Sequence, residues 1–269
     1  MTTEENIDDS SAPLIEHLIE LRQRLMYAVI AIVVLFLICF YFADEIFNIL
    51  VIPYQQGAGT ADVKFIFTAL QEKFFVDVRI AFFGALFLGF PVIATQIYKF
   101  VAPGLYKNEK GAFLPFLIAT PILFFAGACL VYFLIMPLAT SFFLSLEQSG
   151  GGGQAEITNL QSVRAYLDLI MLLIFAFGLV FQLPVAITLL SQAGLVRADT
   201  LSEKRKYAIL GAFVAAAVLT PPDPVSQLGL AIPTILLYEV SILAARRIEK
   251  RREEREKASE SDSTDLTSS

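Results

Sequence analysis

Two carboxylates, Glu20 and Glu109, are the residues whose type and surroundings best suggest chemistry. Glu109 lies in a short polar segment between two long apolar runs, with Lys107 and Lys110 beside it. Glu20 lies in an amphipathic N-terminal stretch, four residues before Arg24, so the two can form an ion pair on one helix face. Two carboxylates on the same cation-rich face of a membrane could capture a cationic peptide. The alternative for Glu20 is a solvated surface ion pair.

The elements that must position these carboxylates are membrane helices. The chain has 269 residues, of which 56% are apolar, and its mean hydropathy is +0.66. Soluble domains are about 45–50% apolar. Charged residues are few and clustered, so long stretches carry none. We therefore expect one integral membrane domain.

Six apolar segments predict an all-α, polytopic protein with six transmembrane helices. They cover residues 25–42, 74–94, 111–138, 169–190, 207–219 and 228–243. A helix needs about 20 residues to cross the hydrocarbon core, so the fifth and sixth are short, at roughly 20 and 24 Å. We expect two short spans beside a thinned bilayer. The alternative is a buried helical hairpin that never crosses.

The distribution of basic residues predicts the orientation of these helices. With the N-terminus inside, sixteen Lys and Arg residues fall on the inner side and four on the outer side. The positive-inside rule then favours N-in and C-in. We expect a cytoplasmic amphipathic N-terminus (1–24), a six-span membrane domain (25–243) and a charged cytoplasmic tail (244–269) that is disordered after Lys257. The main outer loops are predicted at 44–73 and 139–164.

Other functional classes fit these residues less well. One histidine, His17, and two cysteines inside apolar runs, Cys39 and Cys129, do not suggest a metal site or a disulfide framework. His-Glu-x-x-His and Gly-x-Ser-x-Gly motifs are absent from the sequence, so we expect neither an enzyme nor a cofactor. We expect no nucleic-acid partner. A secondary transporter of small solutes is the alternative function, although Gln182 is the one polar candidate deep in a span.

Gln182 stands two residues before Pro184 in the fourth span. A proline frees a backbone carbonyl one turn earlier, and a polar side chain in a membrane helix is a functional candidate. Gln182 is predicted to dock a partner helix or to hydrogen-bond a neighbouring helix.

Two further polar residues belong to the last span. Asp223 and Pro224 suit the N-cap and first positions of a helix. Glu239, near the inner end of that span, is expected to pair with a basic residue such as Arg246 or Arg247.

Three motifs occur in order along the chain. They are Leu14-Ile-Glu-His-Leu-Ile-Glu-Leu-Arg-Gln-Arg-Leu25, Phe100-Val-Ala-Pro-Gly-Leu-Tyr-Lys-Asn-Glu109, and Leu219-Thr-Pro-Pro-Asp223 with Ser226-Gln227 and Ala231-Ile-Pro233 behind it. Together they resemble the TatC family, the multi-span subunit of the twin-arginine protein translocase. The motifs are similar to its N-terminal motif, its first cytoplasmic loop, and its last outer turn with the sixth span. The resemblance covers about residues 12 to 245.

This resemblance implies a cup-like bundle in the bacterial cytoplasmic (inner) membrane. Such a protein recognises the twin-arginine signal peptides of folded precursors and starts their export, driven by the proton-motive force. The resemblance assigns signal-peptide binding to Glu20, Glu109, Arg22, Phe100, Leu105 and Tyr106. A guanidinium pairs with a carboxylate through two parallel hydrogen bonds, which a lysine cannot reproduce.

The same resemblance implies partners. They are single-span subunits of the TatA and TatB type and other copies of the chain, all within a lipid bilayer. The resemblance assigns docking of partner helices to Gln182, Thr220 and Gln227. It assigns a structural or functional role in the outer loops to Pro53, Tyr132 and Asp223. Many relatives carry Glu where Gln182 stands. Because glutamine cannot titrate, we do not expect a proton relay at this position.

Overall fold

The computed structural model describes residues 5–105, 114–146, 161–220 and 223–267. Its contacts divide the chain into two compact units. The first comprises residues 1–51 and 67–121, and the second comprises residues 52–66 and 122–269. Both are built mainly from helices, which confirms the all-α class.

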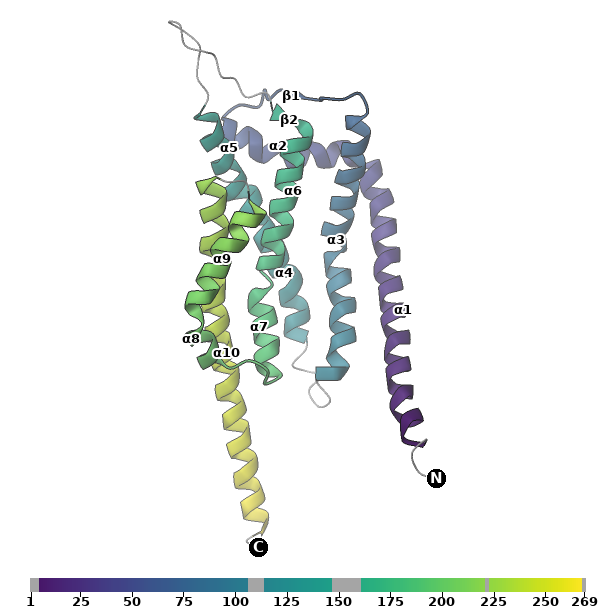
Figure 1. The fold of residues 1–269 in the computed structure, drawn as a ribbon, viewed down its shortest axis with the longest axis vertical. Helices are drawn as coiled ribbons and strands as arrows, with labels where there is room; N and C mark the ends of the chain where they lie inside the picture. The colour runs from purple at the N-terminus through teal and green to yellow at the C-terminus, as the bar shows by residue number, and fades with distance from the viewer. Residues whose placement is uncertain (1–4, 106–113, 147–160, 221–222, 268–269) are drawn as a thin grey trace, which may run out of the picture. The chain divides into compact units, whose positions relative to one another are not determined.

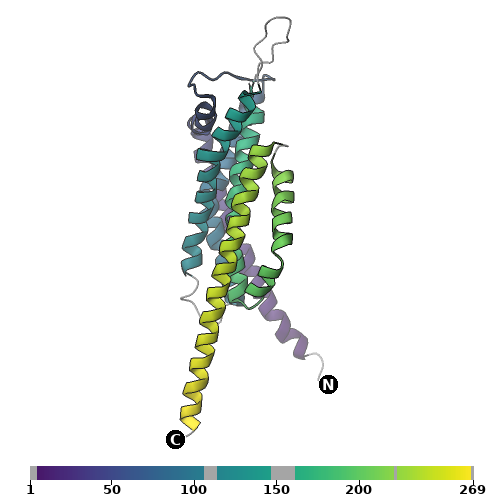
Figure 2. The same cartoon turned by 90° about the vertical axis from the view of Figure 1, so that its left-hand side faces the viewer.

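The first unit is built around two long helices, α1 (Glu5–Tyr41) and α3 (Glu72–Leu105). They lie side by side in Figures 1 and 2 and run in opposite directions. Close approach depends on a small residue of α3, because a Cβ at Gly84 would lie 2.9 Å from the Sγ of buried Cys39 on α1.

Polar and aromatic contacts tie the two ends of this helical pair. At one end His17 of α1 stacks on Phe100 of α3, with ring centroids 4.2 Å apart. At the other end Lys73 Nζ donates to Asp77 Oδ1 at 2.5 Å and to Asp44 Oδ1 at 2.6 Å, at the start of α2 (Ala43–Ala58). The N-terminal part of α1 and the C-terminal part of α3 therefore form one end of the first unit.

The second unit contains the later helices and a two-stranded parallel sheet. Its elements after α4 (Leu114–Leu130, which begins in the first unit) are η2 (Val131–Ile135), α5 (Met136–Leu144), α6 (Val163–Val180), α7 (Leu183–Gln192), α8 (Ala198–Glu203), α9 (Arg205–Leu219) and α10 (Pro224–Thr267). The strands β1 (Phe65–Ile66) and β2 (Gln161–Ser162) pair Phe65 with Gln161 and Ile66 with Ser162. Its core includes the fully buried side chains Phe124, Leu167, Ile170, Phe177 and Leu230.

Helices α9 and α10 lie side by side (Figures 1 and 2). The guanidinium of Arg205 forms a forked ion pair with Glu239, with both N–O distances at 2.8 Å. The prediction that Glu239 pairs with a basic residue is confirmed, but the residue is Arg205 and not Arg246 or Arg247. The partner lies on the neighbouring helix, 34 residues away in the chain.

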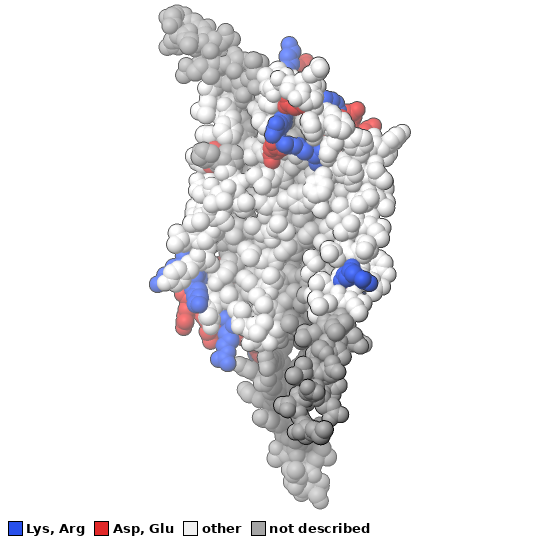
Figure 3. Space-filling model, turned by 45° about the vertical axis from the view of Figure 1, so that its right-hand side comes forward, with Lys and Arg blue, Asp and Glu red and all other residues white. Residues whose placement is uncertain are grey.

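Five helical stretches of the described chain are long and apolar enough to cross a membrane. They are His17–Tyr41, Glu72–Phe100, Pro115–Leu144, Val163–Gln192 and Pro224–Lys250. On the face drawn in Figure 3, charged side chains gather towards helix ends and uncharged surface lies between them. The remaining predicted span, the fifth, corresponds to α9, whose 15 residues cover about 22 Å and fall short of that length criterion.

The prediction of a short sixth helix is wrong. The helix α10 has 44 residues, and its candidate span has 27. The apolar stretch is short, but Pro224 starts the helix before it, and strong helix formers (Ala, Arg, Glu and Lys) continue the helix beyond it. Beyond Lys257, where the sequence predicts disorder, α10 continues to Thr267 through residues that include the weaker helix formers Ser, Asp and Thr.

The predicted outer loop at 44–73 begins with a helix. Asp44 and Glu45 lie in the first turn of α2, where acidic side chains complement the helix dipole. Pro53 lies inside α2 and is fully buried, so it is not a loop residue. Gly59 follows the helix with a φ of 68°, a left-handed conformation that glycine adopts without steric cost.

Candidate functional site

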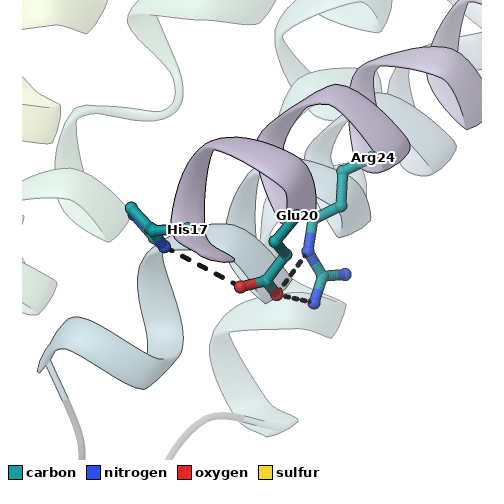
Figure 4. A network of polar contacts seen from close by, with 3 residues as sticks. All are labelled: His17, Glu20 and Arg24. Carbon is teal, nitrogen blue, oxygen red and sulfur yellow. Dashed lines mark hydrogen bonds and ion pairs between the residues drawn. The ribbon is translucent and has the colours of Figure 1, made fainter. Parts of the chain in front are cut away.

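Glu20 accepts hydrogen bonds from a guanidinium of its own helix. Its Oε1 accepts from Arg24 Nε at 2.9 Å and also from Arg24 Nη2, and its Oε2 lies 3.8 Å from His17 Nδ1 (Figure 4). The side chains of Glu20 and Arg24 are 33% and 23% exposed. The ion pair expected from the i,i+4 spacing is therefore present, in a half-buried setting.

The stacking of His17 on Phe100 places Glu20 at the end of the α1/α3 pair where α3 finishes. The two rings are nearly parallel, with an interplanar angle of 15°. This contact joins residues 83 positions apart, so no local sequence signal reveals it. It gives His17 a structural task, whereas the sequence indicated an ordinary polar residue at the membrane interface.

The other predicted peptide-binding residues divide into described and undescribed positions. Arg22 is exposed on α1, and Leu105 is the last residue of α3. Tyr106 and Glu109 lie outside the described residues. The structure thus brings Glu20 and Phe100 to one end of the first unit, and the proximity of the two carboxylates stays a prediction.

Gln182 lies at a break between α6 and α7, which together form one candidate span. Its backbone N–H donates to Leu179 O, three residues earlier, at 2.9 Å. This is a 3₁₀-type bond, whereas an α-helix would pair residues four apart. Its side-chain Nε2 donates to Gly178 O at 3.3 Å and so serves the carbonyl that a regular helix would pair with the Gln182 N–H. Inside hydrocarbon every backbone group needs a partner, so this amide stabilises the break that Pro184 imposes.

Thr220 and Asp223 flank the turn between α9 and α10. Thr220 is 6% exposed, and its hydroxyl donates to Ala216 O at 2.8 Å. Asp223 is 3% exposed, and its Oδ1 accepts the Ser226 N–H at 2.7 Å, which confirms the predicted N-cap of α10. Gln227, in the first turn of α10, is half-buried. Docking roles for these residues stay predictions.

Tyr132 lies within a candidate membrane span and not in an outer loop. It belongs to η2, a π turn in which the Met136 N–H donates to Val131 O, five residues back. Pro137 follows directly; it has no N–H, and its ring would clash with the carbonyl four residues earlier in a regular α-helix. The widened turn avoids that clash.

Two glycines in the second unit allow α4 and α6 to approach closely, and sequence reasoning missed them. A Cβ at Gly127 would lie 2.7 Å from Phe177 O, and a Cβ at Gly178 would lie 2.5 Å from the Phe124 ring. Small residues that bring two backbones together are typical of membrane helix interfaces. Their presence within apolar runs was the available signal.

Glu72, at the start of α3, is a structural residue that sequence reasoning missed. Its carboxylate is buried, at 6% exposure, and Oε2 accepts from Thr68 N at 2.5 Å, Thr68 Oγ1 at 2.8 Å and Ala69 N at 3.2 Å. Glu72 is the first residue of α3, and its carboxylate accepts from the turn that precedes the helix.

Comparison with known proteins assigns the chain to a family. The profile described as "Sec-independent protein translocase protein (TatC)" matches residues 16–233. The chain is 50% identical to the Sec-independent protein translocase protein TatC of Magnetococcus marinus over 256 residues, which cover 95% of this chain and 92% of the relative. It is 38% identical to the protein of that name from Escherichia coli strain K12 over 240 residues, covering 88% and 90% of the two chains.

A solved structure gives the same answer at the level of the fold. The "Crystal Structure of Twin Arginine Translocase Receptor- TatC" superposes with a TM-score of 0.74 at 36% identity, covering 87% of this chain and 99% of that one. The profile covers parts of both units and runs from Glu16, within the first sequence motif, to Pro233 at the end of the third. The chain therefore belongs to the TatC family of Sec-independent protein translocase proteins, a family of non-enzymatic membrane proteins.

Proposed function

We propose that this chain is the signal-peptide receptor and core subunit of a twin-arginine translocase. It exports folded proteins across the bacterial inner membrane with the proton-motive force as the energy source. The observation that carries the proposal is the half-buried carboxylate of Glu20 at the α1/α3 end, beside the Phe100 ring that stacks on His17. The name of the similar crystal structure, a twin-arginine translocase receptor, supports the same function.

The chemistry of this end suits a diarginine ligand. Glu20 already accepts hydrogen bonds from a guanidinium, that of Arg24. The second carboxylate of the proposal, Glu109, follows the last residue of α3 by four positions in the sequence. Two carboxylates would bind two adjacent arginines, and Arg22, Phe100, Leu105 and Tyr106 would contact the rest of the peptide. Forked pairing explains why arginine is preferred to lysine.

The proposal includes six membrane spans with both termini in the cytoplasm. The fifth span is α9, which is shorter than the hydrocarbon thickness and would cross where the bilayer is thinned. Its outward face is apolar, with Tyr207 62%, Leu210 61% and Val218 78% exposed. Reporter fusions at residue 109 and at the N-terminus should report the same side of the membrane, and opposite sides would exclude this arrangement.

The proposed partners are single-span subunits of the TatA and TatB type, and other copies of the chain. Gln182, Thr220 and Gln227 are the proposed docking positions. Thr220 and Gln227 flank the turn that joins α9 to α10, and Gln182 marks the break in the fourth span. Site-specific crosslinking from these three positions to the partner helices tests this part of the proposal.

Replacing Glu20 by glutamine is expected to weaken binding of an Arg-Arg signal peptide about ten-fold. A charge-assisted hydrogen bond in a partly shielded site contributes about 1.5 kcal/mol or more, and the amide removes the charge while it keeps the shape. The measurement is the Kd of a fluorescent signal peptide for the full chain in nanodiscs. Glu109→Gln should have an effect of similar size.

The matched control is Glu45→Gln, which removes an exposed carboxylate from the first turn of α2. It should leave the Kd unchanged. A Lys-Lys peptide should bind the unmodified chain more weakly than the Arg-Arg peptide does. Unchanged Arg-Arg binding in both Glu20→Gln and Glu109→Gln would refute the receptor assignment.

A further inference from the structure

We propose that Arg24 is an internal competitor for the signal peptide, occupying Glu20 while the receptor is empty. The proposal rests on the proposed function, because it concerns the same carboxylate. In the structure the group that Glu20 is expected to bind in a peptide, a guanidinium, is already supplied by the chain itself (Figure 4). A peptide arginine reaches Glu20 Oε1 only when Arg24 leaves it.

The geometry supports replacement of Arg24, since its two bonds converge on one oxygen. Both Nε and Nη2 of Arg24 donate to Oε1, whereas Oε2 faces His17 Nδ1 at 3.8 Å. A carboxylate can accept a forked arginine across its two oxygens, so the internal pair uses Glu20 in a less complete way than a peptide arginine could. Oε2 lies on the side of the His17 ring, which stacks on Phe100 of α3.

The size of the competition follows from the exposure of the pair. Glu20 and Arg24 are both partly exposed. Such i,i+4 pairs favour the state in which Arg24 is bonded to Glu20 over the state in which Glu20 is free by a factor of about 1.4 to 5. The empty receptor is then binding-competent for only part of the time, and its apparent affinity falls in proportion. Removing Arg24 should tighten peptide binding about two- to six-fold.

Competition by Arg24 also predicts how the affinities of two different peptides change. The cost of freeing Glu20 is the same whichever peptide then binds. Arg24→Gln should therefore tighten Arg-Arg and Lys-Lys peptides by the same factor and leave the ratio of their Kd values unchanged. If Arg24 instead contacted the peptide or oriented Glu20 for it, that ratio would change.

The experiment measures the Kd of both peptides for the full chain in nanodiscs, with the variants Arg24→Gln and Lys99→Gln. Lys99 is exposed and adjacent to Phe100 on α3, so its variant removes one positive charge from the same end of the unit. The comparison of the two variants separates displacement from a general loss of positive charge. A double-mutant cycle adds Glu20→Gln, in whose background Arg24→Gln should no longer tighten binding.

Each outcome decides one of the two proposals. Competition by Arg24 is supported if Arg24→Gln binds both peptides more tightly than Lys99→Gln does, and if this gain disappears in the Glu20→Gln background. Binding by Arg24→Gln that is equal to or weaker than binding by Lys99→Gln overturns it, provided that Glu20→Gln alone still weakens binding. If Glu20→Gln alone has no effect, the receptor site itself is wrong and Arg24 has nothing to compete for.

Discussion

Replacing Gly127 by alanine is expected to destabilise the protein by about 1–3 kcal/mol, the usual cost of overpacking a close contact. The added methyl group would lie 2.7 Å from Phe177 O and 2.9 Å from Phe177 C, both backbone atoms that cannot rotate away. The helices α4 and α6 would have to separate, which exposes the packing around Phe177. The measurement is the melting temperature in detergent, followed by the loss of monodisperse protein on size-exclusion chromatography.

The chain offers a matched control in Gly211. This glycine lies in α9, and a Cβ built there has no heavy atom within 4 Å. Gly211→Ala should be neutral or slightly stabilising, because alanine favours a helix by about 1 kcal/mol over glycine. Equal melting temperatures for Gly127→Ala and Gly211→Ala would contradict the close contact between α4 and α6.

Replacing Glu72 by alanine is expected to cost about 1–3 kcal/mol of stability. The variant removes the acceptor for two backbone N–H groups and one hydroxyl at the start of α3, all of which meet at Oε2. It also opens space where a buried side chain stood. The melting temperature of the full chain again reports the loss.

Glutamine at the same position should lose less, since its amide oxygen can still accept these hydrogen bonds without the charge. Glu45→Ala removes an exposed acid from the first turn of α2 and controls for the change in net charge. Equal melting temperatures for Glu72→Ala and Glu45→Ala would show that the cap contributes nothing.

Properties that depend on near neighbours in the chain could be predicted from the sequence. Apolar runs predicted the helices, the i,i+4 spacing predicted the Glu20–Arg24 pair, and Asp223 before Pro224 predicted the cap of α10. Each is set within one or two turns of helix, where spacing fixes geometry. The motif order along the chain also indicated the family, because it does not depend on tertiary contacts.

Contacts between distant segments could not be predicted in this way. Glu239 was expected to pair within its own helix because Arg246 and Arg247 were the visible candidates, but Arg205 on α9 supplies the forked pair. The stacking of His17 on Phe100 likewise depends on how α1 and α3 align. A single sequence gives helix positions but not which helix faces meet.

A proline does not by itself show where a helix ends. Pro53 suggested a loop, yet it is buried inside α2, since a proline costs one hydrogen bond and surrounding burial can offset that cost. In the fourth span, by contrast, Pro184 does accompany a break, and the Gln182 side chain donates to Gly178 O in place of the Gln182 N–H. The outcome at a proline thus depends on neighbours that spacing alone does not reveal.

The π turn at Val131–Ile135 shifts the phase of every position that follows it. A 3.6-residue repeat counted from buried Phe124 predicts burial near position 138. In the structure Leu138 is 49% exposed, whereas Ala139 and Thr140 are buried. Labels that report contact with lipid, placed at successive positions of this helix, should show a regular period before the turn and a shifted period after it. A helical wheel drawn through Pro137 with one constant period therefore misassigns which side chains face lipid.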